Sequence, residues 1–479
     1  MKRMGIVSMF SVAVCSTAVF ATADVTVDFT KKTAELRHAL HSSGLTPRIN
    51  PRGLYNDDPA IKSMNFKYTR THDWALVNTG QRIIDYQNIF PLFDLDAKNP
   101  NYYYFEPSDH IMKIARDVGL EVFYRLGTSI EHTGKTHFNA KVPKDFEKTA
   151  EIFAGIVRHY NKGWAKGYNW NIKYWEIWNE PDGLNNMWCE DNFEWTHENA
   201  ERMRDKFIKF YVICLKRLKS EFPDIKVGGP ALCNYLREFY FIPLLDACKK
   251  AGVQPDFLSW HAYTDNPDKI IDAAEDARKL CDSYGFKDTE LIINEWHYIL
   301  SWDGVHGRSS PAMSKLAYDG PTGLSSIDSA AFSMTVLQRL QTSKYDQAYF
   351  YGCGHAGNWG YMGAYGLYNK VYYSLKIMGD LMRTDKDICE SSAIRKCLTP
   401  LATKSADGKK LHLVLTDYRG TAQVLKAVVK GAEKARKVKA YLLDYNTDLL
   451  PVDAEWRNGV LTLVKPEKSS AVFLVEFSL

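Results

Sequence analysis

The stretch of sequence that decides the fold reads Trp175-Glu176-Ile177-Trp178-Asn179-Glu180-Pro181-Asp182. Its apolar first half predicts a buried strand, and its Asn-Glu-Pro end predicts that the strand stops at a carboxylate. A second Asn-Glu pair, Asn294-Glu295, follows the apolar run 291–293. Parallel strands end at the same edge of a sheet, so the two pairs are expected to lie close together.

Strand patterns alternate with helical patterns from about residue 45 to residue 384. Helical periodicity is clear in four stretches: Ala200–Phe222, Glu238–Ala251, Pro267–Tyr284 and Ile327–Thr342. The expected strands are Phe66–Arg70, Leu120–Leu126, Tyr174–Trp178, Ile225–Gly229, Phe257–His261, Leu291–Ile293 and Gln347–Tyr351, with a weakly defined first strand near Thr46–Asn50. Eight strand-helix units of this length predict a (β/α)8 TIM barrel over residues 45–385. The alternative, an open doubly wound sheet, would bind its ligand at one crevice instead of gathering residues from many strand ends.

The pattern changes from about Ile388, where strands alone are predicted. They are Leu411–Leu415, Gln423–Val429, Val438–Leu443, Val460–Val464 and Ala471–Phe477, separated by turns such as Asp407-Gly408 and Asn458-Gly459. These features predict an accessory β-sandwich over residues 386–479. The early strand Val25–Phe29, within residues 24–44, is expected to join it.

The N-terminus has the pattern of a secretory signal peptide. Lys2 and Arg3 precede an apolar run that ends in Ala21-Thr22-Ala23, a small-x-small cleavage pattern. Removing residues 1–23 takes away those two positive charges, so the net charge falls from +4 to +2. The apolar run is short for a membrane anchor. Cys15 follows Val14, a poor fit to a lipoprotein site. A secreted or periplasmic protein is therefore expected.

Composition excludes several kinds of partner. No Lys/Arg tract interleaves with aromatic residues, so nucleic acid is not an expected partner, and no segment beyond the signal peptide is long and apolar enough to cross a membrane. The nine cysteines show no paired C-x-x-C spacing, so no zinc site is expected. A Cys389–Cys397 disulfide is less favoured than free thiols. No metal or organic cofactor is implied, and no oligomeric state is indicated.

Two carboxylates at the ends of separate strands are what a retaining glycosidase requires. One carboxyl must hold a proton for the leaving oxygen, and the other must be ionised to attack the sugar carbon. Glu180 could instead belong to a helix-capping turn, and Glu295 alone could be a solvated loop acid. Their pairing favours catalysis by both. Trp175 and Trp178 suggest a pocket of the size of a sugar ring.

Other strand ends add candidate binding residues. Arg70 could orient Glu295 and keep it ionised, since a nearby cation favours a carboxylate, although a structural ion pair is the alternative. His72 could bond a sugar hydroxyl or be a core histidine. His261 and Tyr263 share one face of their strand, and the Tyr263 phenol could hold the Glu295 carboxylate in place.

The loop after the eighth strand, Gly352–Trp359, matches the pattern G-x-G-x-x-G. Its late position in the barrel and the lack of an ordinary βαβ unit after it argue against dinucleotide binding. We expect this loop to bring Trp359 to the sugar. In the loop after Glu295, further pocket candidates are Trp296, Trp302 and Arg308.

At these residues the chain resembles glycoside hydrolase family 39, within the clan of retaining (β/α)8 glycosidases. The resemblance covers about residues 45–385, and Trp-Asn-Glu-Pro-Asp at 178–182 is its most specific element. The segment 70–72 resembles the α-L-iduronidase branch, and His261 with Tyr263 resembles the β-xylosidase branch. The resemblance implies Glu180 as the acid/base and Glu295 as the nucleophile. It also implies that Asn179 binds the 2-hydroxyl of the sugar.

Tyr263 stands where the iduronidase branch has a lysine that serves the uronate carboxylate. The sequence therefore predicts a neutral sugar and β-xylosidase-like exo action on an oligosaccharide or polysaccharide, unless Arg125 or Arg308 serves an anionic group. One alternative is a disaccharide-releasing or endo-acting enzyme on an unusual polysaccharide, which could be acidic. The other is a catalytically silent glycan-binding protein.

Overall fold

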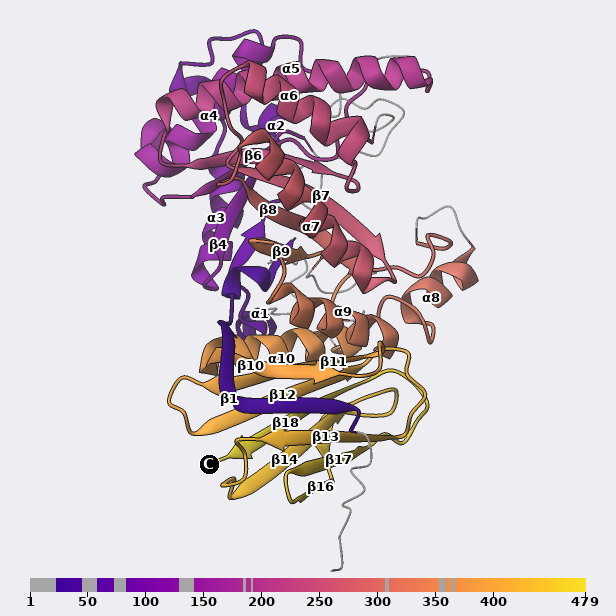
Figure 1. Ribbon diagram of the computed structural model, residues 1–479. Coiled ribbons are helices and arrows are strands. Elements are labelled where there is room, and N and C mark those ends of the chain that lie inside the picture. The colour runs from indigo at the N-terminus through magenta and orange to yellow at the C-terminus, as the bar shows by residue number, and fades with distance from the viewer. Residues whose placement is uncertain are drawn as a thin grey trace, which may run out of the picture.

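The computed structural model describes residues 23–44, 58–72, 83–128, 142–183, 187–190, 193–305, 310–352, 359–362 and 367–479. The chain forms a closed barrel of eight parallel strands and a separate ten-stranded sheet (Figure 1). This architecture confirms the predicted TIM barrel with an accessory β-domain.

The barrel strands follow one another around the barrel in chain order. They are β2 (Ser42–Gly44), β3 (Tyr68–Arg70), β4 (Glu121–Leu126), β5 (Tyr174–Ile177), β6 (Lys226–Leu232), β7 (Phe257–Thr264), β8 (Glu290–Tyr298) and β9 (Gln347–Phe350). The α-helices are α1 (Asp58–Met64), α2 (Tyr86–Ile89), α3 (Glu106–Asp117), α4 (Phe146–Lys162), α5 (His197–Glu221), α6 (Ile242–Lys250), α7 (Pro267–Tyr284), α8 (Pro311–Asp319), α9 (Ile327–Leu340) and α10 (Lys370–Thr384). Short helical turns are η1 (His38–Leu40), η2 (Pro100–Tyr102), η3 (Trp164–Lys166) and η4 (Arg237–Phe241). No helix in these ranges combines the length and apolar character that a bilayer crossing requires.

The first barrel strand corrects a prediction. It is β2, which pairs with β3 and β9, and it precedes the stretch 46–50 where a strand was expected. The expected stretch lies outside the described residues. The sequence of β2 is Ser-Ser-Gly, which has none of the apolar alternation by which strands are recognised.

The accessory sheet has the order β15-β14-β18-β12-β11-β10-β1-β13-β17-β16. Its N-terminal member, β1 (Val25–Glu35), pairs antiparallel with β10 and parallel with β13, and appears in Figure 1 as an indigo strand among orange and yellow ones. The others are β10 (Asp385–Ala393), β11 (Leu398–Ser405), β12 (Lys410–Asp417), β13 (Val424–Lys430), β14 (Lys437–Leu443), β15 (Asp448–Val452), β16 (Ala454–Arg457), β17 (Val460–Val464) and β18 (Ala471–Ser478). Cys389 and Cys397 are both free thiols.

The sheet is joined to the barrel through side chains on α9 and on the loop after β12. Gln338 of α9 donates to the carbonyls of Thr399 and Val414, both at 2.9 Å. Arg419 binds Asp265, beyond the end of β7, at 2.7 Å and the hydroxyl of Tyr298, at the end of β8, at 3.0 Å. The accessory sheet therefore supports the ends of two barrel strands.

The barrel interior is layered along the strands. One layer consists of buried apolar and aromatic side chains: Phe123, Tyr174, Phe257, Ile292 and Tyr349, with Tyr68 packed against them. Two residues further along three of these strands, on the same face, come the buried polar side chains of Arg70, Glu176 and Ser259. The aromatic layer closes the barrel below the polar one, so the polar groups gather toward the C-terminal ends of the strands.

A bulge in β8 departs from this alternation. Trp260 and His261 of β7 face Ile293 and Glu295 of β8, which leaves Asn294 as an extra residue. The register with β9 shows the same shift between Ile293 and Trp296. A bulge changes the directions of successive side chains. Asn294 and Glu295, although adjacent, therefore both bond to groups inside the barrel.

Candidate active site

Glu295 lies at the C-terminal part of β8 and is 3% exposed. Its Oε1 accepts a hydrogen bond from Nη1 of Arg70 at 2.7 Å, and the Nε2 atom of His72 lies 3.4 Å from the same oxygen. Its Oε2 accepts from the Tyr263 hydroxyl at 2.5 Å. A guanidinium and a phenol therefore hold one carboxyl oxygen each.

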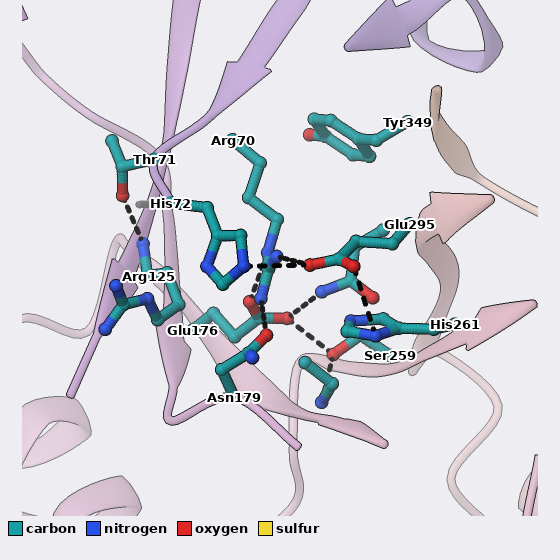
Figure 2. A network of polar contacts seen from close by, with 12 residues as sticks. Arg70, Thr71, His72, Arg125, Glu176, Asn179, Ser259, His261, Glu295 and Tyr349 are labelled. Carbon is teal, nitrogen blue, oxygen red and sulfur yellow. Dashed lines mark hydrogen bonds and ion pairs between the residues drawn. The ribbon is translucent and has the colours of Figure 1, made fainter. Parts of the chain in front are cut away.

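Arg70 is the centre of this network (Figure 2). Its three nitrogens donate to three acceptors: Nε to Glu176 at 2.6 Å, Nη1 to Glu295 at 2.7 Å and Nη2 to Asn179 at 2.7 Å. Burial alone would lower the pKa of Arg70, but the carboxylates of Glu176 and Glu295 outweigh it and raise that pKa. Arg70 is therefore a permanent positive charge next to Glu295.

Asn179 shows how Arg70 fixes a neighbouring amide. Because Nη2 of Arg70 can only donate, the amide oxygen Oδ1 must face it. Nδ2 then points elsewhere, is buried, and has no hydrogen-bond partner among the described residues. This leaves one unused donor beside the two carboxylates.

Glu180 follows β5 in a strained segment. Trp178 has φ 75° and Glu180 has φ 44°, both in the left-handed region that residues other than glycine rarely adopt. The segment is held by the bond from the Glu180 main-chain nitrogen to the Ala231 carbonyl, at 2.8 Å. Asp182 then accepts from the main-chain nitrogen of Cys233 at 3.0 and 3.1 Å. The end of β6 therefore fixes the conformation of the Glu180 loop, consistent with strain being retained at functional sites.

Asp182 is a second acid in that loop, and the sequence did not single it out. Burial raises the pKa of Asp182 to about 7, the Cys233 main-chain nitrogen opposes the rise, and the charge of Glu180 adds to it.

His261 lies between the two glutamates. Its Nδ1 is 2.7 Å from Oε1 of Glu180 and 3.4 Å from Oε2 of Glu295. Burial lowers the pKa of His261 to about 3, with Glu295 acting in the opposite direction. His261 is therefore neutral near neutral pH and adds no positive charge to the site.

The glutamates face one another across the barrel mouth. Three atoms lie within 4.8 Å of one another: one carboxylate oxygen of Glu180, one of Glu295 and a ring nitrogen of His261. Retaining glycosidases hold their two carboxyl groups roughly 5–5.5 Å apart, and inverting ones roughly 6.5–9.5 Å apart. An oxygen–oxygen distance of at most 4.8 Å is nearer to the retaining spacing than to the inverting one.

Aromatic side chains form one wall beside Glu295. The ring of Tyr263 lies 5.5 Å from Trp302, 5.9 Å from Tyr351 and 5.5 Å from Trp359, centre to centre. Trp302 is 46% exposed and Trp359 is half-buried. The structure thus brings Trp302 and Trp359 together at the site. It adds Tyr351, which the sequence analysis missed because it stands at the end of an apolar strand.

Three other tryptophans were assigned wrongly. Trp175, Trp178 and Trp296 are fully buried in the hydrophobic core, so they cannot form the expected sugar-sized pocket or bind a sugar. Trp296 follows the inward Glu295 and packs on Phe350, 5.2 Å away. Trp175 stacks on Tyr124 at 4.9 Å. Alternation along a strand sends the neighbour of an inward residue outward, to the layer between barrel and helices.

The two arginines considered for anionic groups have different outcomes. Arg125 is fully buried and its Nη2 donates to the buried Asp85 at 3.0 Å. It is therefore a member of an internal ion pair. Arg308 lies outside the described residues, as do residues 353–358 of the glycine-containing loop.

A groove of about 490 Å³ adjoins the site. His261 and Tyr263 line one part of it, and Asn234, Tyr235 and Lys269 line another. It could hold a further part of a substrate beyond the catalytic pair.

An eight-stranded parallel barrel whose strand ends carry such a pair of glutamates defines the class of barrel-type glycosyl hydrolases. The sequence profile described as "Glycosyl hydrolases family 39" matches residues 52–279. The matched part is a little under half of the chain, and it confirms the resemblance to this family seen in the sequence.

Relatives and solved structures agree with this assignment. A beta-xylosidase from Geobacillus stearothermophilus is 26% identical over 212 residues, which cover 42% of this chain and 37% of that protein. A beta-xylosidase from Caldicellulosiruptor saccharolyticus is 22% identical over 414 residues, or 80% of this chain and 77% of that protein. The crystal structure of a glucosidase from Croceicoccus marinus superposes with a TM-score of 0.73 at 20% identity, over 95% of this chain and 99% of that one. At that identity the structural likeness concerns the fold.

Proposed function

We propose that the protein is a secreted, retaining glycoside hydrolase that works by double displacement. Glu180 gives its proton to the leaving oxygen while a Glu295 oxygen bonds to the anomeric carbon and the glycosidic bond breaks. Water then attacks the glycosyl-enzyme, Glu180 takes a proton from it, and Glu295 is released. The observation that carries this proposal is the pair of carboxyl groups within 4.8 Å in unlike surroundings.

The other residues support these steps. Arg70 keeps Glu295 anionic and the Tyr263 hydroxyl fixes its orientation. Burial raises the pKa of Tyr263 well above its usual value, and Glu295 raises it further, so the phenol remains a donor. The unused Nδ2 of Asn179 is suited to donate to a sugar hydroxyl, such as the 2-hydroxyl that the family resemblance implies.

For the substrate, we propose a neutral glycan cleaved from its end in the manner of a β-xylosidase. Both relatives described above carry the name beta-xylosidase. In the described part of the site, the three side-chain nitrogens of Arg70 bond to Glu176, Glu295 and Asn179, and Arg125 forms an ion pair with Asp85. A substrate carboxylate buried without a cationic partner would be strongly disfavoured. The apolar run before Asp24 supports export.

A second candidate is an enzyme that releases disaccharides or cleaves internally. The groove beside His261 and Tyr263 supports it, because the groove extends to Lys269, Asp272 and Asp276 on α7 and could hold a second sugar unit.

The test is a panel of aryl glycosides and oligosaccharides with the product followed by NMR. Retention at the anomeric carbon and release of single neutral sugars are expected. Inversion would refute the mechanism, and release of disaccharides would favour the second candidate. A protein with no activity on the panel but measurable oligosaccharide binding would be a silent glycan-binding protein.

A further inference from the structure

Glu176 is a buried acid in the barrel that the proposed mechanism does not use. It is 0% exposed and lies one layer below the catalytic pair, on β5. Its Oε2 accepts from Nε of Arg70, and its Oε1 accepts from the Ser259 hydroxyl and from Nδ2 of Asn294, each at 2.6 Å. All three partners donate, which matches an ionised carboxylate.

These contacts lead to the nucleophile by two routes. The guanidinium of Arg70 is planar, so a bond that fixes Nε also fixes the direction of Nη1, which holds Glu295. Asn294 is the extra residue of the β8 bulge and directly precedes Glu295. Glu176 thus bonds the cation beside the nucleophile (Figure 2) and also the side chain of the residue that precedes the nucleophile in β8.

The charges show a second consequence of this arrangement. Arg70 is shared between Glu176 at 2.6 Å and Glu295 at 2.7 Å. Burial raises the pKa of Glu176, and Arg70 and Ser259 oppose that rise. With two carboxylates around one cation, the attraction of Arg70 for Glu295 is partly offset by the repulsion from Glu176.

We propose that Glu176 is a positioning residue for the glycosyl-transfer step: it orients Arg70 and the β8 bulge, and its charge keeps Glu295 nucleophilic. The proposal rests on the proposed role of Glu295. Glu176 lies one layer below the site and does not contact Glu295. On this proposal it nevertheless controls the position and reactivity of Glu295.

Other ionisable groups around Glu295 bear on any test by pH. Among the described residues they are Arg70 and His72 from the β3 end, Glu180 from the β5 end, His261 and Tyr263 from β7, and Tyr351 from the β9 end. None of these is changed in the variants below.

The decisive variant is Glu176→Gln. A glutamine at this position has one accepting oxygen and one donating nitrogen, so it cannot accept from all three donors. We expect kcat/KM to fall roughly 10- to 100-fold, as for a slightly misplaced catalytic group. We also expect the acidic limb of the kcat/KM profile to move to lower pH, because Arg70 then faces the charge of Glu295 alone.

Glu176→Asp keeps the charge and shortens the side chain. We expect a lower kcat with little change in KM, since substrate does not touch residue 176, and an unmoved acidic limb. If Glu176→Gln does not fold, Glu176→Asp alone still tests the positioning, because a wild-type kcat in this variant would overturn it. An unmoved limb in a folded Glu176→Gln protein would also overturn the proposal.

Asp85→Asn is the matched control. It removes the acid from the other buried arginine-acid pair, Arg125–Asp85, at 3.0 Å. We expect a loss of stability comparable to that of Glu176→Gln but no movement of the acidic limb. Glu295→Ala with azide, measured in parallel, separates the two hypotheses: a fully active Glu295→Ala protein refutes the proposed function, whereas azide rescue with an unmoved Glu176→Gln limb refutes only the role of Glu176.

Discussion

The ends of β5 and β8 each present a glutamate to the same space, but the two surroundings are opposite. Glu295 is 3% exposed and accepts bonds from Arg70 and Tyr263. The side chain of Glu180 is 17% exposed and lies 2.7 Å from the neutral His261. The carboxyl group of Glu295 therefore bonds a cation, whereas that of Glu180 contacts a neutral imidazole ring.

This difference supports the roles proposed above for the two glutamates. A carboxyl group that bonds a fixed guanidinium and a phenol is held in one orientation, as a nucleophile must be. A carboxyl group that meets a neutral imidazole and solvent can hold a proton and exchange it with water, as an acid/base must. Distance alone would not tell the two residues apart.

The largest effect is expected at the β8 end. Glu295→Ala should lower kcat by at least about 10⁴-fold, because the variant has no group to form the glycosyl-enzyme. Azide should restore part of the rate and yield a product of inverted configuration, since it attacks from the vacated face. Steady-state kinetics and NMR of the product measure both.

Glu290→Ala is the control for this variant. Glu290 is a carboxylate at the other end of the same strand, paired with Lys226 away from the catalytic pair. Its variant should keep the wild-type rate. A Glu295→Ala enzyme with near-normal turnover would reverse the comparison between the two strand ends.

At the β5 end the effect should depend on the leaving group. Glu180→Gln keeps the shape but cannot give a proton, so oligosaccharides should lose about 10²- to 10⁴-fold. Activated aryl glycosides need little protonation and should lose much less in the first step, which a burst of released phenol would reveal. Equal losses on both kinds of substrate would contradict an acid role for Glu180.

A smaller effect is expected at the Tyr263 hydroxyl, which bonds Glu295. Tyr263→Phe removes the 2.5 Å donor to Oε2 of Glu295. A hydrogen bond to a charged group contributes about 1.5–3 kcal/mol, which corresponds to a loss of roughly 10- to 150-fold in kcat. The loss should be the same for good and poor leaving groups, in contrast with Glu180→Gln.

Tyr298→Phe is the control for the phenol. Tyr298 lies on β8 three residues after Glu295, and its hydroxyl accepts from Arg419 at the accessory sheet. We expect an unchanged kcat and a slightly lower melting temperature. A Tyr263→Phe enzyme as active as Tyr298→Phe would show that the carboxylate of Glu295 does not depend on this donor.

Much of this arrangement could be predicted from the sequence. Helical periodicity and strand count gave the barrel, and the rule that active sites lie at C-terminal strand ends brought Arg70 and Tyr263 to Glu295. These predictions succeeded because they depend on regular alternation. The β5 and β8 ends were found because each places an Asn-Glu pair after an apolar run.

What was missed depends on departures from regularity. The bulge that turns both Asn294 and Glu295 inward has no sequence signature beyond the pair itself. Glu176 could have been noticed as an acid two residues from Tyr174 within a buried strand, but its three partners come from β3, β7 and β8. Trp175, Trp178 and Trp296 were wrongly predicted to lie at the sugar pocket, because composition does not tell which face of a strand a ring occupies.

The smallest effect concerns the aromatic wall, and it asks on which side of the catalytic pair the sugar rests. Trp302 packs against Tyr263, the partner of Glu295, and is 46% exposed. If it forms a platform for the sugar that becomes attached to Glu295, Trp302→Ala should raise KM about 5- to 30-fold, the equivalent of roughly 1–2 kcal/mol of lost apolar contact. The change should be alike for all leaving groups, because the leaving group lies toward Glu180. Trp456→Ala removes a tryptophan that packs on Phe477 in the accessory sheet, and it should leave KM unchanged. A Trp302→Ala enzyme that discriminated between leaving groups would instead put this ring on the Glu180 side, and the aromatic wall would no longer distinguish the β8 end from the β5 end.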